Sequence, residues 1–468
     1  MPTSPAAIGS DLLFLDALGP TGPYRSRDHL TLCDVSGTPA GRLSLVPKLY
    51  VSRAISALRK AEALPVEDRL TALKHAGELF ATGTVAGLTA TEYATAVCRM
   101  SGTPLANVRT AIHSIRARAA EAYRSAQAAR PVGAVNDWRD PLARTGRAVW
   151  TRRGDVLAVH APGNHPAVHT TWLEALALGY HVAIRPSRRE PLTSYRLVAA
   201  LREAGFGQDR VAWLPTGHDA ADELLHRADL SLVYGGQDVI DKYAHVPTVL
   251  PNGPGRSKIL VTAECDWRDH LDVIADSVAR HGGTACVNTT AVFVEGDPAP
   301  LAEALAEQLS AIPSLPPQDD RAVLPVHPAA DARAISDHLL GLRAKAVGAT
   351  ARLGGDGVAD GLGDGSAALR PAVHVLDDPH DHRAGTELPF PCVWVAPWTR
   401  QAGTGVLKDT LVLTAITEDE ELLDQLLAEP SVRNLYIGGH PTHWMEPGIP
   451  HDAYLGEFLM RTKAVIRG

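Results

Sequence analysis

A cysteine stands among small residues in the segment HGGTACVNTTA, residues 281–291. Free cysteine is often a small core residue, so Cys286 has a structural interpretation as well as a chemical one. A thiolate is a strong nucleophile, and small neighbours such as Gly283 and Ala285 would let its sulfur reach a carbonyl carbon. The residue types therefore allow either a buried position or covalent catalysis at Cys286.

An asparagine follows Pro-Gly in the segment HAPGNHPAVHTTW, residues 160–172. We expect a strand before this turn and a helix after it, and open α/β sheets bind ligands at the carboxyl ends of their strands. There the side-chain N–H of Asn164 could stabilise an oxyanion, or the side chain could cap the following helix. Both interpretations stay open from the residues alone.

Two further turns have residue types that suit a dinucleotide. The segment IRPSRREPLT, residues 184–193, places arginines and a serine between a predicted strand and a predicted helix. A guanidinium group matches phosphate geometry, so Arg188 and Arg189 would suit a 2′-phosphate, although a solvated basic turn has the same composition. The segment VYGGQDVI, residues 233–240, puts two glycines before a helix, which permits close approach of a pyrophosphate but is a weak signal.

The elements that must position these turns alternate along the chain. Strands are predicted at 155–161, 180–187, 210–217 and 229–236 with helices between them, and a second series begins near Ser257. This spacing is typical of βαβ crossovers and parallel sheets. Helical periodicity covers residues 48–130, and the stretch 130–146 is expected to be a loop or an extended arm. The glycine-rich stretch 353–371 is expected to be a surface loop.

Composition limits the class of protein. With 468 residues, 45% hydrophobic and 21% charged, the chain is typical of a globular protein with two or three domains. A net charge of −8 without a long basic run argues against nucleic-acid binding. No apolar stretch approaches the roughly 18 residues of a membrane span, and the N-terminus does not resemble a signal peptide. Five scattered cysteines favour a reducing cytoplasm, and nothing singles out His160, His165, His169 or His281 as a metal ligand.

Taken together, the order and spacing of these motifs resemble the aldehyde dehydrogenase superfamily from about Pro39 to the C-terminus. The resemblance implies an α/β fold with a Rossmann-like cofactor domain, an α/β catalytic domain and a small β oligomerisation arm. The implied boundaries are 1–131 and 151–250 for the cofactor domain, 251–435 for the catalytic domain, and 132–150 and 436–468 for the arm. In this family the arm pairs between subunits, so a homodimer or homotetramer is implied.

The resemblance also implies roles for single residues. GTACVNTTAVFV resembles the nucleophile segment, with Cys286 as nucleophile, and GNHP resembles the turn that supplies the oxyanion donor, here Asn164. IRPS resembles a Lys-Pro-Ser cofactor loop with Arg185 in the lysine position, and ELPFP (387–391) resembles the Glu-x-x-Phe motif at the nicotinamide ribose. The implied cofactor contacts are Arg185, Ser187, Arg188, Gly217, Gly235, Gly236, Glu387 and Phe390.

One departure from the family pattern bears on the reaction. Hydrolytic members have a glutamate that activates water, and the matching segment here, LPNGPGRSK (250–258), has Asn252 in its place. An asparagine cannot accept that proton, so hydrolysis of an acyl-enzyme should be slow. Loss of the glutamate resembles the branches that exchange the acyl group with a thiol. A looser similarity, around GNHP and YGG, is to the bioluminescence-type acyl-thioester reductases.

The expected function is NADPH-dependent reduction of an acyl thioester to an aldehyde, or the reverse reaction with a thiol acceptor. Acyl-CoA or an acyl-carrier protein is the expected partner. NADP is expected because Arg185, Arg188 and Arg189 share one loop, and NAD is the alternative. Hydrolytic oxidation of an aldehyde, reduction of an acyl phosphate and a non-catalytic cofactor-binding scaffold remain alternatives.

Overall fold

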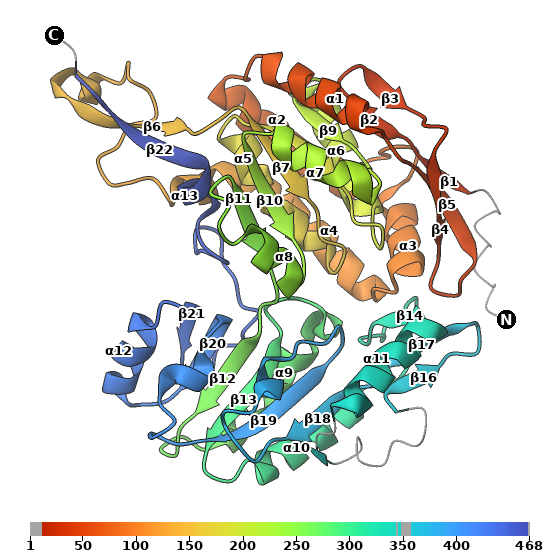
Figure 1. Ribbon diagram of the computed structural model, residues 1–468, viewed down its shortest axis with the longest axis vertical. Coiled ribbons are helices and arrows are strands. Elements are labelled where there is room, and N and C mark those ends of the chain that lie inside the picture. Colours follow the sequence, from red (N-terminus) through yellow and green to blue (C-terminus); the bar gives the residue numbers. More distant parts are fainter. Residues whose placement is uncertain (1–11, 343–344, 348–356, 467–468) are drawn as a thin grey trace.

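The protein has two lobes, each built on a seven-stranded sheet, and a two-stranded ribbon that projects from the upper lobe (Figure 1). The structure is a computed structural model that describes residues 12–342, 345–347 and 357–466. The chain passes from the upper sheet to the lower one between Asn252 and Ser257. The predicted α/β fold with parallel sheets is confirmed.

The upper sheet is doubly wound. Its strand order is β11-β10-β7-β8-β9-β2-β3, in which β7 to β11 run parallel and β2 and β3 are antiparallel. The strands are β2 (Ala17–Gly19), β3 (Gly22–Tyr24), β7 (Val156–His160), β8 (His181–Arg185), β9 (Val211–Trp213), β10 (Leu230–Tyr234) and β11 (Val249–Asn252). The chain runs outward from β7 to β9 on one side and returns to β10 on the other. The switch point between β7 and β10 is therefore where this architecture binds ligands.

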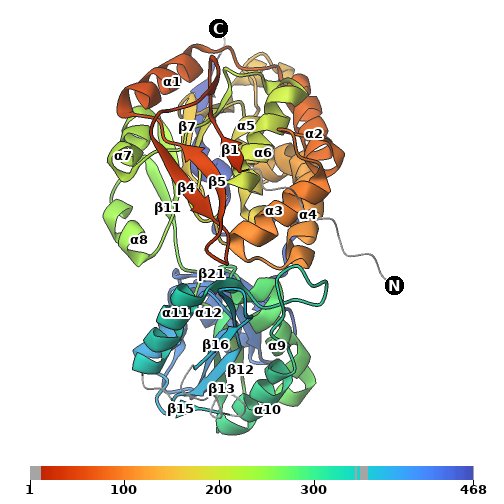
Figure 2. The same ribbon diagram turned by 90° about the vertical axis from the view of Figure 1, so that its right-hand side faces the viewer.

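Helices cover both faces of the upper sheet because its strands are apolar on both faces. Val156 and Ala158 of β7 pack in the cluster that contains α1 and α7, whereas Leu157 and Val159 pack in the cluster that contains α2, α4, α5 and α6. Figure 2 shows these two groups of helices on opposite sides of the sheet. The helices are α1 (Lys48–Lys60), α2 (Val66–Thr82), α3 (Ala90–Ser101), α4 (Leu105–Gln127), α5 (Leu173–Ala177), α6 (Leu192–Leu201), α7 (His218–Arg227) and α8 (Gln237–Tyr243).

The lower sheet has the order β15-β18-β19-β13-β12-β20-β21 and is parallel except at β15. Its strands are β12 (Ser257–Val261), β13 (Thr289–Glu295), β15 (Lys345–Ala346), β18 (Ala372–Val375), β19 (Cys392–Trp398), β20 (Thr410–Ile416) and β21 (Val432–Ile437). One face packs against α9 (Leu271–Ala279) and α10 (Ala299–Ser310), and the other against α11 (Ala329–Gly341) and α12 (Glu420–Ala428).

Two local predictions differ from the structure. The segment after Pro166 is not one helix but a 3-10 turn, η2 (Pro166–Thr170), followed by the short α5. The second difference concerns the predicted surface loop at 353–371, of which residues 353–356 lie outside the described residues. From residue 357 onwards the loop prediction is wrong, because β16 (Ala359–Gly361) and β17 (Ser366–Leu369) form a hairpin, and β17 pairs with β14 (Val326–Pro328). Glycines at positive φ close that hairpin, and composition alone indicates only the turn.

Small sheets complete both ends of the upper lobe. An N-terminal sheet of β1 (Leu13–Leu15), β5 (Pro39–Ser44) and β4 (His29–Cys33), which the sequence analysis does not predict, lies at the edge that faces the viewer in Figure 2. The ribbon pairs β6 (Arg147–Arg152) with β22 (Met460–Val465) in antiparallel register. The chain reaches β22 from β21 through residues 438–454, here called the tail, and α13 (Leu455–Leu459), so the tail connects the lower sheet to the ribbon (Figure 1).

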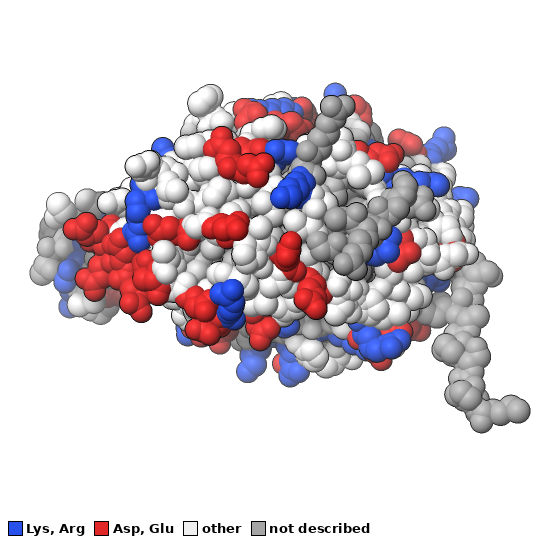
Figure 3. Space-filling model, turned by 90° about the horizontal axis from the view of Figure 1, so that it is seen from below, with Lys and Arg blue, Asp and Glu red and all other residues white. Residues whose placement is uncertain are grey.

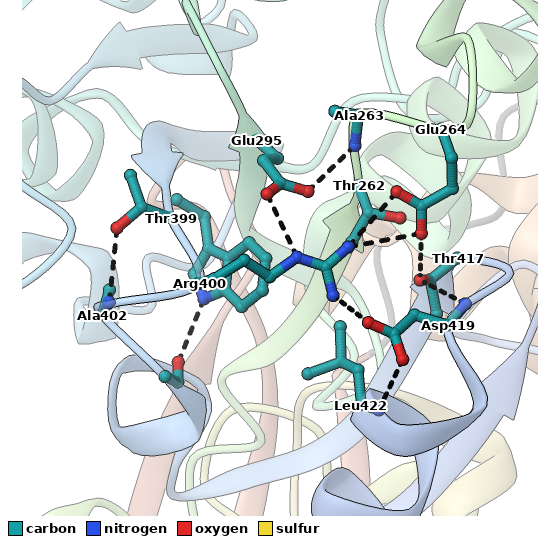
Figure 4. Close-up of polar contacts among 12 residues, drawn as sticks. Thr262, Ala263, Glu264, Glu295, Thr399, Arg400, Ala402, Thr417, Asp419 and Leu422 are labelled. Carbon is teal, nitrogen blue, oxygen red and sulfur yellow. Dashed lines mark hydrogen bonds and ion pairs between the residues drawn. The ribbon is translucent and has the colours of Figure 1, made fainter.

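A network of ion pairs lies at the end of the lower sheet that is farther from the upper lobe. The guanidinium of Arg400 contacts Glu264, which follows β12, Glu295 at the end of β13, and Asp419 (Figure 4). Its Nε lies 3.1 Å from Glu295 Oε1 and its Nη2 lies 3.3 Å from Glu264 Oε2. One cation therefore joins the carboxyl ends of neighbouring parallel strands.

The surface agrees with the acidic composition. Seen from below, basic side chains are scattered, and the largest cluster of charge is acidic and lies at the end of the lower lobe that carries α12 (Figure 3). Among the described residues, no helix is both long and apolar enough to cross a bilayer.

Candidate active site

A cavity of about 670 Å³ lies where the two sheets meet. The upper sheet contributes the turns after β7 and β10, which contain Asn164 and Gly235, and the lower sheet contributes the loop before β13, which contains Cys286. Glu387 and part of the tail complete the lining. The carboxyl ends of one sheet thus face the amino ends of the other across the cavity, at the switch point of the upper sheet.

The loop before β13 holds Cys286 by close backbone packing. His281, Gly282 and Gly283 have positive φ angles of 57°, 71° and 66°. A side chain at Gly283 would lie 2.4 Å from the backbone nitrogen of Pro391, and one at Gly255 would lie 1.8 Å from the carbonyl oxygen of Cys286. The glycines are therefore needed because the segments that contain Gly255, Cys286 and Pro391 pack closely against one another, as well as for room around the sulfur.

Side-chain hydrogen bonds fix the same loop. Asn288 Oδ1 accepts from the backbone N–H of Ala285 at 2.9 Å, and its Nδ2 donates to the carbonyls of Ser277 and Arg280 at 3.1 and 2.8 Å. Ser257 Oγ donates to the Cys286 carbonyl at 3.1 Å. The backbone on both sides of the sulfur is thus held in place, which a positioned nucleophile requires.

Asn164 lies against this loop and lines the cavity with Cys286. Its Nδ2 donates to the carbonyl of Thr284 at 3.1 Å. The cap of the following turn is His165, whose ring nitrogen accepts from Ala167 N at 3.2 Å, so the capping alternative for Asn164 is not what the structure shows. The amide has a second N–H, which is the group an oxyanion would need.

Asn252 ends β11 and also lines the cavity. It pairs in register with Tyr234 of β10, and its side chain and that of Thr171 hydrogen-bond the Tyr234 hydroxyl. Burial raises the pKa of Tyr234, and these hydrogen bonds oppose the shift. An amide therefore occupies the position expected for a water-activating carboxylate.

The predicted cofactor residues of the upper lobe gather at the carboxyl edge of its sheet. Arg185 ends β8, and its Nε donates to Thr216 Oγ1 at 2.9 Å. Gly217 and Gly236 are the residues that precede α7 and α8. Ser187 and Gly235 line the cavity.

Arg188 and Arg189, in the turn between β8 and α6, have different surroundings. Arg188 is exposed. Arg189 is half-buried, its pKa is lowered by burial, and the opposing charge that acts on it is Asp331 of α11. Arg189 thus interacts with the lower lobe, and Arg185 and Arg188 remain as candidates for a 2′-phosphate.

Glu387 and Phe390 differ in their placement. Glu387 lines the cavity, and its Oε2 accepts from the backbone N–H of Arg256 at 2.9 Å. Burial raises the pKa of Glu387, and hydrogen bonds from the Arg256 and Gly255 backbones oppose that shift. Phe390 is 1% exposed and packs in the core of the lower lobe.

Two further residues of the site, His451 and Asp452, are not predicted from the sequence. His451 Nε2 lies 3.7 Å from Cys286 Sγ, and His451 Nδ1 lies 2.6 Å from Asp452 Oδ2. Their side chains are 34% and 25% exposed, and both line the cavity. They stand in the tail, which the family resemblance assigns to the oligomerisation arm. The only local signal is a histidine next to an aspartate in a Pro/Gly-containing stretch, EPGIPHDAY.

Three other histidines pack in the cavity wall. The rings of His165 and His281 lie 4.6 Å apart, and those of His281 and His443 lie 5.9 Å apart. Burial lowers the pKa of His165 to about 4 and that of His281 to about 3, so both are neutral near pH 7. Within the described part of the chain, no three metal-ligating side chains form a metal site.

A pair of opposite charges lines another part of the cavity. Arg118 of α4 and Glu174 of α5 come from packed helices and interact electrostatically. Burial raises the pKa of Glu174 to about 7, and the charge of Arg118 opposes this shift. This region is therefore polar rather than a purely apolar tunnel.

Comparison with known proteins gives one family. A sequence model of the aldehyde dehydrogenase family matches residues 35–402. The NADP/NAD-dependent aldehyde dehydrogenase PuuC of Escherichia coli is 26% identical over 263 residues, which are 53% of this chain and 51% of PuuC. Human aldehyde dehydrogenase 1A1 is 26% identical over 145 residues, 29% of each chain. These alignments span about half the relatives' length or less.

Solved structures agree over nearly the whole chain. An NAD-dependent aldehyde dehydrogenase from Sinorhizobium meliloti has a TM-score of 0.80 at 18% identity, covering 99% of this chain and 97% of that one. An NADP-dependent enzyme of E. coli has a TM-score of 0.79 at 16% identity, covering 98% and 99%. At these identities the structures establish the fold.

Proposed function

Because the chain belongs to the aldehyde dehydrogenase family, a family of oxidoreductases that act on aldehydes, we propose that it interconverts an acyl thioester and an aldehyde with NADP(H). The acyl group is carried on Cys286 during the reaction. Acyl-CoA or an acyl-carrier protein is the proposed thioester partner.

The chemistry follows from the groups that line the cavity. In the thioester direction, Cys286 sulfur bonds to the carbonyl carbon, and the oxyanion that develops is stabilised by Asn164 Nδ2–H and the Cys286 backbone N–H. The thiolate then leaves, which gives an acyl-enzyme. After reduction of the acyl carbon, the carbon–sulfur bond to Cys286 breaks and releases the aldehyde.

The cofactor site fits a dinucleotide at the carboxyl edge of the upper sheet. Arg185, Ser187, Arg188, Gly217, Gly235 and Gly236 would hold its ribose and phosphates, with Glu387 at the nicotinamide end. A side chain on Gly235 would lie 2.4 Å from the side chain of Val239, so this turn packs closely against α8 only with glycine at this position. Bound NADP(H) would supply or accept the hydride.

Asn252 is the observation that carries the thiol assignment. Its amide lines the same cavity as Cys286 and cannot take a proton from water near neutral pH. Two carboxylates of the lining have other partners: Glu387 accepts from Arg256, and Asp452 pairs with His451. An acyl-enzyme formed here should therefore persist in water until hydride or a thiol arrives.

A hydrolytic oxidation of aldehydes to acids is the second candidate, and one contact favours it. His451 Nε2 lies 3.7 Å from Cys286 Sγ, so an imidazole is close enough to serve as a base for water in place of the missing glutamate. The two candidates differ in whether a thiol is required for turnover.

Product analysis separates the candidates. With an aldehyde and NADP⁺ alone, we expect a burst of about one NADPH per active site followed by slow turnover, and added coenzyme A or a carrier-protein thiol should restore the rate. Peptide mapping during the burst should find the acyl group on Cys286. General-base help is worth about 10²–10⁴-fold, so Asn252→Glu should raise the rate of acid formation whereas the matched Asn252→Gln should not. Rapid formation of free acid without thiol would instead establish the hydrolytic function.

A further inference from the structure

We propose that His451, held by Asp452, is the acid–base residue that takes the Cys286 thiol proton, and that the tail delivers it to the nucleophile. This inference goes beyond the proposed function, because activation of the sulfur is needed whichever group accepts the acyl chain.

The geometry gives each nitrogen of the ring a separate task. Nδ1 lies 2.6 Å from the Asp452 carboxylate, and a carboxylate partner places the proton of the neutral ring on Nδ1. The lone pair of Nε2 then faces Cys286 Sγ at 3.7 Å, within the range of a hydrogen bond to sulfur. Nucleophile, base and orienting acid thus follow the logic of a catalytic triad, in which the base and the acid are neighbours in the tail and the nucleophile comes from a distant part of the chain.

The backbone of the pair is fixed to the same sheet that positions the cysteine. Asn434 of β21 donates from Nδ2 to the His451 carbonyl and, at 2.9 Å, to the carbonyl of Leu411. Arg433 donates from Nη1 to the Asp452 carbonyl at 3.3 Å. Nucleophile and base therefore share a rigid scaffold, the lower sheet, even though 165 residues separate them.

The charges around the imidazole favour its protonated form. Burial alone would lower the pKa of His451, but the charges of Cys286 and Asp452 outweigh it and raise that pKa well above its usual value. Burial raises the pKa of Asp452, and His451 and Arg433 more than reverse that shift. Tyr234 also interacts electrostatically with Asp452 and Cys286, and it stays neutral because burial raises its pKa. A proton leaving the thiol is thus accommodated on His451.

The proton is conserved through the thioester step. The Cys286 S–H proton first moves to His451 Nε2, which gives the ion pair that the surrounding charges favour. The thiolate then bonds to the carbonyl carbon as the carbonyl π electrons move to oxygen. When the tetrahedral adduct collapses, the bond to the departing sulfur breaks, and the proton on Nε2 passes to that thiolate. His451 is then neutral again, ready to deprotonate an incoming thiol in the reverse direction.

The test is the pH dependence of alkylation of Cys286 by iodoacetamide in the full-length protein, followed by peptide mass mapping. We expect His451→Gln to slow alkylation at pH 7 at least tenfold, and its rate to rise with pH towards about 8.5, as for an unassisted thiol. Asp452→Asn keeps the imidazole ring of His451, so its alkylation rate at pH 7 should fall between those of wild type and His451→Gln. Because alkylation needs neither thioester nor cofactor, this result does not depend on which acyl acceptor the enzyme uses.

Two controls separate chemistry from damage to the tail. His440→Gln changes an exposed tail histidine outside the cavity and should leave the profile unchanged, and the exposed Cys33 provides a reference thiol in each sample. Turnover of His451→Gln should fall about 10²–10⁴-fold. A His451→Gln protein that melts earlier but alkylates with the wild-type rate and profile would show a structural role only and overturn the proposal.

Discussion

At the scale of single residues, Cys286 differs from the other free cysteines in its surroundings. Cys98 and Cys392 are buried, and burial raises the pKa of both thiols, that of Cys98 to about 12. Cys286 instead faces a cavity with an amide donor and an imidazole beside it. The same residue type thus serves packing in two places, and we propose that it serves reactivity in a third, where its neighbours differ.

Cofactor preference should depend on Arg188. Arg189 is half-buried and interacts electrostatically with Asp331 of the lower lobe, which leaves Arg188 as the exposed arginine of the β8–α6 turn. A charge-assisted phosphate contact is worth roughly 1.5–3 kcal/mol, so we expect about ten- to a hundredfold higher kcat/KM with NADPH than with NADH. Arg188→Glu should abolish or reverse that ratio, whereas Arg189→Gln should change it less. Equal values for both cofactors, unaffected by Arg188→Glu, would contradict the assignment.

The raised pKa of Glu174 predicts that the free energy of unfolding of the protein depends on pH. Its pKa is about 7 in the folded protein against an ordinary value of 4.5, so between these values the unfolded chain ionises while the folded one keeps its proton. Stability should therefore fall as pH rises through this interval, by about 1–3 kcal/mol at most. We expect Glu174→Gln to melt at a higher temperature than wild type at pH 8 and at the same temperature near pH 4. Glu446→Gln, an exposed residue of the same cavity, is the control and should show no such difference.

At the scale of elements, the strands that position the site could be predicted because their pattern is local. The run from 155 to 161 is nearly all apolar, as a strand buried on both faces must be, and β7 occupies Val156–His160. The N-terminal sheet escaped prediction although β4 alternates between exposed and less exposed residues, because strands of three to six residues without the flanking helices of a βαβ pattern are difficult to recognise. Short strands are fixed by their partners more than by their own sequence.

The base of the proposed triad could not be predicted for a different reason. The tail lacks helical or strand periodicity, and its position follows from contacts with β21 made by Asn434 and Arg433. Nothing near His451 in the sequence indicates that Cys286 is its neighbour. Asn164, by contrast, lines the cavity from a turn after a parallel strand, and the location of such a turn is predictable.

The Arg400 network predicts a modest, pH-sensitive contribution to the stability of the lower lobe. Arg400 is 42% exposed, so its contacts with Glu264 and Glu295 are screened and worth about 1 kcal/mol together. We expect Arg400→Gln to lower the melting temperature at pH 7 by about 2–4 °C. Arg321→Gln, which removes one exposed pair with Asp319, should have almost no effect.

The direction in which the stabilisation by the Arg400 network changes with pH follows from the pKa of Glu264. Burial raises the pKa of this carboxyl group, but hydrogen bonds from Thr262 and Thr417 and the charge of Arg400 outweigh burial and lower it to about 2. A carboxylate with a depressed pKa stabilises the fold above about pH 4.5 and loses that contribution as pH falls towards 2. The melting difference between wild type and Arg400→Gln should therefore shrink over this interval, as followed by scanning calorimetry. A difference that stays constant with pH would show that Arg400 acts through packing alone.

At the scale of the whole molecule, the site depends on three parts of the chain that meet only in the folded protein. The upper sheet supplies Asn164, the lower sheet supplies Cys286, and the tail supplies His451. The tail is held at one end by β21 and at the other by α13 and β22, which pairs with β6 in the ribbon. The position of the base is therefore tied to the ribbon as well as to the lower sheet.

The ribbon and its neighbours should be an interface between copies of the chain. Leu142 and Ile466, together with Val132, are large apolar residues that are exposed on this projecting part. We expect light scattering to show a homodimer or homotetramer, and Leu142→Ser with Ile466→Ser to lower the mass to that of the monomer, because the apolar area that subunits would bury is removed. Leu49→Ser with Leu427→Ser removes equally exposed leucines on α1 and α12 and should leave the mass unchanged. Since the ribbon anchors the tail, the monomeric variant should also alkylate Cys286 more slowly at pH 7. An unchanged mass would leave the ribbon as an internal anchor of His451 rather than an interface.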